Sequence, residues 1–176
     1  MPEGLRYEPD FLSSPEEQAL LEEIRALPLE EAKYKSFRAK RRTVSYGSSY
    51  DFDTNVLGAA PPIPAFLLPL RTRVGELAGL DEKAFQHALV TEYRPGTELG
   101  WHRDVPEFEV VVGVSLAGIC RMRFRRYPPE KGAKAFNLDL EPRSLYVLRD
   151  EIRWRWQHSV APTKELRYSI TFRTRR

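Results

Sequence analysis

The sequence is short of cysteine and of long apolar runs. Its single cysteine, Cys120, excludes an intrachain disulfide and suits a reducing compartment, so we expect a cytoplasmic protein in which Cys120 is a small core residue. No stretch approaches the roughly 18 apolar residues that span a membrane, and the segment MPEGLRYEPDF has no apolar run of signal-peptide length. The sequence predicts neither a membrane segment nor a disulfide framework.

The chain also lacks internal repeats, low-complexity tracts and linkers. Its 176 residues, of which 41% are hydrophobic and 30% charged, therefore predict one globular domain, 1–176. The formal net charge is only +3, although the isoelectric point is about 9.0. This basicity permits an anionic partner such as nucleic acid but does not require one.

Helix signals are confined to the first 80 residues. We expect a first helix with Ser14 as its cap, Pro15 in its first position and Glu17 completing a capping box, ended by Pro28. A second helix is expected over about residues 65–78, after a turn-rich segment, 51–66, that reads as a loop.

After residue 80 the pattern changes to short strands separated by turns. We expect strands near 87–93, 110–117, 120–126, 135–140, 144–149, 157–161 and 166–174. Two helices followed by seven or eight strands predict an α+β, mainly β fold, in which a double-sheet barrel has the helices packed on one side.

Three histidines are present, and two of them suit a metal site. His102 and Asp104 are two apart on an extended segment, so their side chains point the same way. His158, at a strand start, can be folded back beside them. Two histidines and a carboxylate form the facial triad of non-haem Fe(II) oxygenases, although zinc hydrolysis would accept the same set. His87 has no partner at ligand spacing and is expected to be structural.

The stretch RYSITFR near the C-terminus has the alternation of a strand. One face carries Arg167, Ser169, Thr171 and Arg173, and the other Tyr168, Ile170 and Phe172. Taken alone, the polar face would meet water. Beside a metal, buried arginines would need anionic partners. A dicarboxylate that chelates iron fits this demand, with Arg167 on its distal carboxylate, Ser169 adding a hydroxyl, and Arg173 pairing with the chelating end or with Asp104.

Together these motifs resemble the AlkB-type Fe(II)- and 2-oxoglutarate-dependent dioxygenases, in particular a compact bacterial subgroup. The motifs that match are Tyr93-x-Pro95-Gly96, His102-x-Asp104, His158 and Arg167-x-Ser169-x-Thr171-x-Arg173, over about residues 87–174. The resemblance implies a double-stranded β-helix, or jelly roll, with residues 81–176 as catalytic core and residues 1–80 as helical support and substrate lid.

The resemblance also assigns roles to single residues. It implies that His102, Asp104 and His158 are the catalytic iron ligands, and that Tyr93 and Arg167 bind 2-oxoglutarate. Thr91, Ser169 and Arg173 complete the co-substrate set. Many nucleic-acid demethylases of the family have Asn where this chain has Thr91 and Ser169. A repair member has a second Asp where this chain has Pro106, which leaves the identity of the base open.

The reaction implied by the resemblance is oxidative demethylation of N-alkylated bases in DNA or RNA, as in DNA repair. It would consume O2 and 2-oxoglutarate and release formaldehyde, succinate and CO2. An oxygenase acting on a protein side chain or small molecule is the alternative. A binding module without turnover is the third reading, and the intact set of three ligands with Arg167 argues against it.

Two basic clusters are candidates for contact with the substrate. The first falls where the family has its nucleotide-recognition lid and comprises Lys35, Arg38, Lys40, Arg41 and Arg42, with Tyr46 and Tyr50. The second comprises Arg121, Arg123, Arg125 and Arg126. Cations and aromatic rings suit single-stranded or base-flipped nucleic acid, but ordinary solvated faces would look the same. We expect an alkylated nucleic acid as partner, no membrane, and a monomer.

Overall fold

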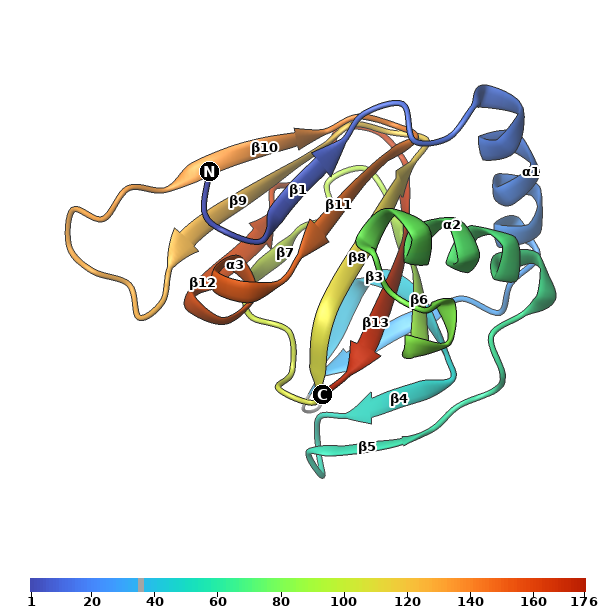
Figure 1. Cartoon of the computed structure of the whole chain (residues 1–176), viewed down its shortest axis with the longest axis horizontal. Helices are drawn as coiled ribbons and strands as arrows, with labels where there is room; N and C mark the ends of the chain where they lie inside the picture. Colours follow the sequence, from blue (N-terminus) through green and yellow to red (C-terminus); the bar gives the residue numbers. More distant parts are fainter. Residues whose placement is uncertain (35–36) are drawn as a thin grey trace.

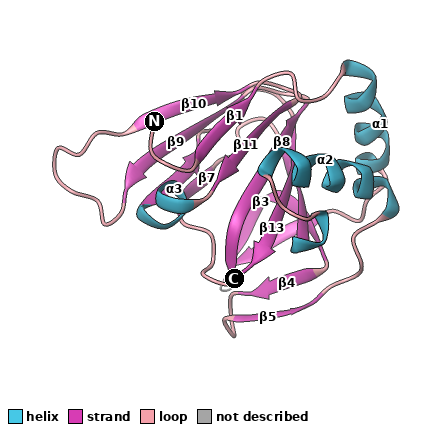
Figure 2. Cartoon of the chain, in the orientation of Figure 1, coloured by secondary structure: helices cyan, strands magenta, loops and turns pink. Residues whose placement is uncertain are grey.

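The computed structural model describes the backbone of residues 1–34 and 37–176, and all side chains except those of residues 33–39. Two antiparallel sheets face each other, and two helices cover the outer face of the larger sheet (Figures 1 and 2). This arrangement is the expected mainly β jelly roll with helices on one side. Within the described residues, no helix combines the length and apolarity needed to cross a bilayer.

The larger sheet has seven strands. Their order is β1 (Leu5–Glu8), β11 (Ser144–Leu148), β8 (Phe108–Leu116), β13 (Arg167–Arg175), β6 (Phe85–Tyr93), β3 (Phe37–Tyr46) and β2 (Glu30–Tyr34). The smaller sheet has the order β10 (Phe136–Leu140), β9 (Cys120–Arg126), β12 (Trp156–Val160) and β7 (Leu99–His102). A separate hairpin joins β4 (Ser48–Asp51) to β5 (Val56–Ala59).

Apolar residues form two cores, one on each side of the larger sheet. The outer core lies between the sheet and helices α1 (Ser14–Arg25) and α2 (Leu68–Ala78), and β13 contributes Tyr168, Ile170 and Phe172 to it. The inner core lies between the two sheets, and Cys120 is buried there as a free thiol. Burial raises the pKa of this thiol, which makes Cys120 a poor nucleophile and fits the expected core role.

The capping box of α1 is shifted by one residue from its expected place. Ser13, which is extended (φ −75°, ψ 162°), is the cap: its Oγ accepts from the Glu16 amide, and its own amide donates to Glu16 Oε1. Glu17 is instead buried and accepts from the Ala117 amide at 3.1 Å. The expectation of Ser14 and Glu17 was therefore wrong by one residue, because the extended backbone of a cap is at Ser13 and Ser14 is already helical.

The seven expected strands are present, but several other elements were not anticipated. The first 80 residues contribute β1, β2 and β3 to the larger sheet as well as the two helices. The segment 51–66 contains β5 rather than only loop, and β7 and the short helix α3 (Asp150–Arg155) were also missed. Several of these strands have only four residues, so distant pairing partners define them rather than their own composition.

Candidate metal and co-substrate site

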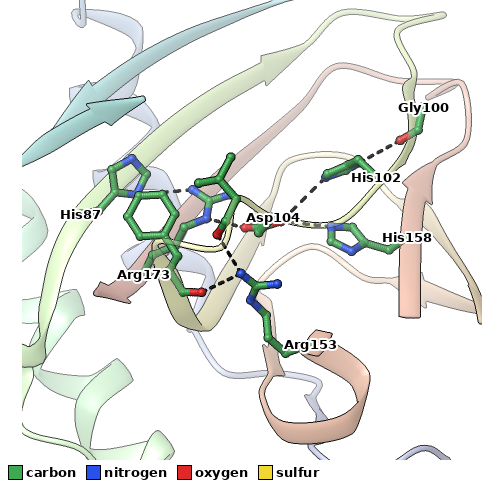
Figure 3. Close-up of polar contacts among 9 residues, drawn as sticks. His87, Gly100, His102, Asp104, Arg153, His158 and Arg173 are labelled. Carbon is green, nitrogen blue, oxygen red and sulfur yellow. Dashed lines mark hydrogen bonds and ion pairs between the residues drawn. The ribbon is translucent and has the colours of Figure 1, made fainter. Parts of the chain in front are cut away.

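Two histidines and one aspartate converge between the sheets, as the sequence predicts. His102 ends β7, Asp104 follows it in a loop, and His158 lies on β12 directly opposite His102. One ligand atom from each lies within 4.8 Å of the others. Asp104 Oδ1 is 3.8 Å from His102 Nε2 and 3.5 Å from His158 Nε2 (Figure 3). The pairing of β7 with β12 thus brings together residues that are far apart in sequence.

Outer contacts orient two of these three side chains. His102 Nδ1 lies 2.8 Å from the Gly100 carbonyl, which can only accept, so Nδ1 carries the proton and Nε2 presents its lone pair to the site. Asp104 Oδ2 accepts from Arg173 Nε at 2.5 Å, which leaves Oδ1 toward the histidines. The expected pairing of Arg173 with Asp104 is present. Such contacts preorganise the donor atoms before a metal arrives.

The electrostatics hold all three groups in the protonation state that metal ligation requires. Burial opposes ionisation of Asp104, but Arg173 and the two histidines hold the pKa of its carboxyl well below its ordinary value. Burial, reinforced by the neighbouring His102, lowers the pKa of His158 to about 3. At neutral pH the cluster is therefore one carboxylate with two neutral imidazoles, a donor set that fits Fe(II).

A polar wall on β13 adjoins this cluster. Arg167 is fully buried, donates from Nε to Ser115 Oγ at 3.0 Å, and lies over the Tyr93 ring at 4.9 Å. Among the side chains that the structure describes, no carboxylate lies within 4.0 Å of its guanidinium. A buried cation without an anion is costly, so this arrangement suits an anionic ligand such as the distal carboxylate of 2-oxoglutarate.

Beside Arg167, three short hydroxyl side chains form a row across the larger sheet. Ser169 pairs with Thr91 on β6 and with Ser115 on β8, and all three residues are buried. Tyr93 pairs with Arg167 on the same face. The structure therefore places the expected co-substrate residues on one buried surface, although both positions where the family often has Asn carry smaller groups here.

His87 is not part of the metal cluster found among the described residues, in keeping with its expected structural role. Its Nδ1 lies 3.4 Å from Arg173 Nη1, and its ring packs 4.6 Å from that of Phe108. Burial, with a further contribution from Arg173, lowers its pKa to about 3, so the ring is neutral. His87 thus supports Arg173, which in turn holds Asp104.

Sequence reasoning missed Arg153, which fastens the loop that carries Asp104. Arg153 projects from α3, and its Nη2 donates to the carbonyls of Val105 at 2.9 Å and Phe108 at 2.6 Å (Figure 3). It is buried, and burial lowers the pKa of its guanidinium. The sequence carried no signal for it, because α3 was not expected.

Sequence reasoning also missed Tyr146. A Cβ atom on Gly113, its partner across β8 and β11, would lie 2.3 Å from the Tyr146 ring, so the glycine makes room for the phenol. Burial raises the pKa of Tyr146, and the charges of Arg167 and Asp104 both act on it. Its hydroxyl therefore stays protonated near the polar wall. Strand β11 is buried on both faces, so its sequence is an apolar run without alternation. Such a run gives no sign that Tyr146 faces the site.

The first basic cluster does not form one surface. Strand β3 pairs with β6 so that Thr43 lies opposite Thr91, on the site face, and Arg41 shares that face by alternation. The charge of Arg41 acts on His102, which agrees with this placement. Lys40 is exposed. Lys35 and the side chain of Arg38 lie outside the described residues.

Arg42 and Tyr46 correct the expectation of a shared substrate surface, because they lie on the opposite face. Arg42 makes a bidentate ion pair with Glu92, with both N–O distances 2.7 Å, and Tyr46 is buried in the outer core. Tyr50 lies on the β4–β5 hairpin, where it packs edge-on against Phe52 and donates to Asn55. Among the members of this cluster whose side chains the structure describes, Arg41 is the one that its strand places toward the metal cluster.

Comparison with known proteins agrees with this geometry. The family described as the 2OG-Fe(II) oxygenase superfamily matches residues 4–173, and the chain therefore belongs to it. Members of this superfamily use Fe(II), 2-oxoglutarate and O2, and the His-Asp-His cluster fits the iron. Within the superfamily the chain is AlkB-like, because its curated relatives include ALKBH proteins. One of them, the Probable RNA/DNA demethylase ALKBH6 of Danio rerio, is 25% identical over 90% of this chain and 70% of its own length.

Among curated relatives, an uncharacterised protein, L905, of Acanthamoeba polyphaga mimivirus is 35% identical over 53% of this chain and 50% of its own length. The Alkylated DNA repair protein ALKBH8 homolog of Arabidopsis thaliana is 30% identical over 89% of this chain and 50% of its own length. The chain thus spans half the length of these two relatives. They come from a virus and a plant, so membership of a bacterial subgroup stays a prediction.

Solved structures share the fold at low sequence identity. OsALKBH1 superposes with a TM-score of 0.78 at 17% identity, covering 99% of this chain and 98% of that one. A prolyl-4-hydroxylase from Pseudomonas putida gives a TM-score of 0.65 at 17% identity, covering 98% of this chain and 93% of that one. At this identity the two likenesses concern the fold alone.

Proposed function

We propose that this oxygenase oxidatively demethylates N-alkylated bases in single-stranded or base-flipped DNA or RNA. His102, Asp104 and His158 would hold the iron, and Arg167 the distal carboxylate of 2-oxoglutarate, with Tyr93, Thr91 and Ser169 lining that site. The observation that carries this proposal is the pairing of a preorganised three-ligand cluster with a buried, anion-free guanidinium on the adjoining wall. The substrate class is supported by relatives named for alkylated DNA repair and RNA/DNA demethylation.

The bound iron would supply the oxidising chemistry: one oxygen atom of O2 enters the N-methyl group and the other enters succinate as CO2 leaves. The hydroxylated methyl group then departs as formaldehyde, which restores the base. The chain's own part is to bind and orient. Arg167 would fix the co-substrate bidentately, Arg173 keeps Asp104 ionised, and Arg153 holds the loop between Asp104 and β8 in place.

The test is incubation with Fe(II) and 2-oxoglutarate without oxygen, followed by exposure to O2, with a panel of methylated DNA and RNA oligonucleotides. We expect demethylated base and formaldehyde in equal amounts, matched by succinate, and none with the His158→Ala variant. Succinate formation without demethylation of any oligonucleotide, together with no salt-dependent oligonucleotide binding, would favour a protein or small-molecule substrate instead. A monomeric state and a cytoplasmic location stay predictions beside this proposal.

A further inference from the structure

The outer face of the smaller sheet carries three of the four arginines of the second basic cluster. In β9 the side chains of Cys120, Met122 and Phe124 point into the inner core, so Arg121, Arg123 and Arg125 point outward by alternation. Strand β12 runs beside β9 and presents Gln157 and Ser159 on the same outer face. The sheet lies on the left of Figure 1, away from the two helices.

Two of the four arginines in this cluster are already neutralised. Arg121 makes a bidentate pair with Asp139, at 2.8 and 3.0 Å, and Arg126 pairs with Glu151 at 2.7 Å. Both pairs lie on the exposed surface, and each carboxylate compensates its arginine. These two arginines therefore contribute little to the attraction of an external anion.

Arg123 and Arg125 are different, because they are held in place without being neutralised. Their Nε atoms donate to Ser159 Oγ at 2.9 Å and to Gln157 Oε1 at 3.0 Å, respectively. Both guanidiniums lie over the ring of Trp101, at 5.5 and 4.3 Å from its centroid. Among the described side chains, neither has a carboxylate within 4.0 Å. Neutral partners thus fix both side chains and leave their positive charge uncompensated.

A third such arginine continues this surface toward the metal cluster. Arg103 lies over the Tyr127 ring at 3.9 Å and donates to the Trp154 carbonyl at 3.0 Å. It lines a pocket of about 380 Å³ that also includes Asp104 and Gln157. Gln157 therefore joins the arginines on the sheet face to the pocket beside Asp104.

The sequence around His102 links the two sides of the smaller sheet. His102 faces inward to the metal cluster, whereas Trp101 directly before it lies under Arg123 and Arg125, and Arg103 directly after it lines the pocket. A ligand lying along this surface would therefore reach the neighbourhood of the metal cluster.

We propose that Trp101, Arg103, Arg123, Arg125 and Tyr127, here called the arginine strip, bind the phosphate backbone of the single strand that flanks the methylated base. Alternate residues of a strand lie about 7 Å apart, so Arg123 and Arg125 can contact successive phosphates. Their neutral partners occupy only Nε and leave the Nη donors for phosphate oxygens, and single-strand sites combine such a basic surface with aromatic side chains. This inference rests on the proposed nucleic-acid substrate and adds a surface to it.

The experiment compares Arg123→Gln/Arg125→Gln with Arg121→Gln as the matched control. Arg121 lies on the same strand and face but is paired with Asp139. Its substitution therefore removes a positive charge from this face without changing a residue of the arginine strip. Binding of a fluorescent single-stranded oligonucleotide is measured by anisotropy between about 50 and 200 mM salt. We expect the double variant to bind at least about 10-fold more weakly at the lower salt, with a salt slope smaller by about 1.4, since each phosphate contact to a single strand contributes about 0.7. The control should stay within about twofold of the wild type.

The outcomes separate this inference from the proposed function. If the wild type binds and the double variant binds equally well, or no more weakly than Arg121→Gln, the strip is not the contact surface although nucleic-acid binding stands. If the wild type itself does not bind at low salt, the proposed nucleic-acid substrate is wrong, and the proposed role of the strip falls with it. Circular dichroism and melting temperature show whether the double variant is folded, and Arg123→Lys/Arg125→Lys, which keeps the charge but loses the planar donors, should bind with intermediate affinity.

Discussion

The two faces of β13 are both buried, yet they have opposite chemistry. On the helix side, Ile170 and Phe172 pack into the outer core. On the site side, Arg167 and Ser169 are equally inaccessible to water. The first face stabilises the fold by removing apolar area from water, at about 25 cal/mol per Å². The second costs folding free energy and is arranged for a ligand. Because successive side chains of β13 point to opposite faces, the residues that stabilise the fold and the residues that line the site alternate along one strand.

The largest expected effect is on the metal cluster. His158→Ala removes one of three ligands, so succinate formation from 2-oxoglutarate should fall by well over about 100-fold, since even outer partners of metal ligands contribute 10- to 100-fold. Fe(II) content after gel filtration should fall with it, while the melting temperature of the metal-free protein changes little. Unchanged succinate yield would remove His158 from the site.

A substitution on the helix-side face of β13 should lower stability and leave co-substrate binding unchanged. Phe172→Ala leaves a cavity in the outer core, so the free energy of unfolding should fall by about 3–5 kcal/mol, measured by urea titration. The 2-oxoglutarate requirement of the protein that remains folded should not change. A large change in that requirement with little loss of stability would contradict the separation of the two faces.

Arg167→Met is the matched change on the site face. The 2-oxoglutarate requirement should rise roughly 10- to 100-fold, because the loss of charged hydrogen bonds costs about 1.5–3 kcal/mol. Without 2-oxoglutarate the variant should be as stable as the wild type or more so, since a buried cation has been replaced by an apolar side chain of similar volume. Arg167→Lys, which keeps the charge, should be intermediate. A destabilised variant with a normal requirement would instead make Arg167 structural.

The smallest effect concerns Glu92, which lies near the end of β6 between Tyr168 of β13 and Arg42 of β3. It accepts from Arg42 and from the Tyr168 hydroxyl, and these contacts, Arg42 first, hold the pKa of its carboxyl below 4.5 against the opposing effect of burial. Glu92→Gln should lower the free energy of unfolding at pH 7 by about 1–2 kcal/mol.

The pH dependence of that difference has a definite sign. A carboxyl whose pKa is depressed in the folded state stabilises the fold above its unfolded pKa. The contribution is then lost as pH falls through the lower folded pKa. The gap between wild type and Glu92→Gln should therefore be full at pH 6–7 and narrow below about pH 4.5, as followed by urea titration at each pH. A gap that widens on acidification would contradict this origin.

The site was predictable where local alternation decides it. His102 and Asp104 are two apart, and β13 alternates strictly, so both patterns can be read without knowing any partner strand. Arg41 and Arg42 show the limit: both are basic, and only the register of β3 against β6 decides which one faces the site. A shift of one residue would exchange them.

The sequence by itself determined the mainly β fold, the donor types of the metal cluster and the division of β13 into an apolar and a polar face, because these depend on residue chemistry and on the two-residue repeat of a strand. Only the tertiary structure decided that the polar face is buried, that Arg153 and Tyr146 adjoin the site, and that Arg123 and Arg125 keep uncompensated charge while Arg121 and Arg126 do not. Those outcomes depend on which distant strands pair and in what register. Pairing and register are set by loop closure and by packing between residues far apart in the sequence, so no local pattern reveals them.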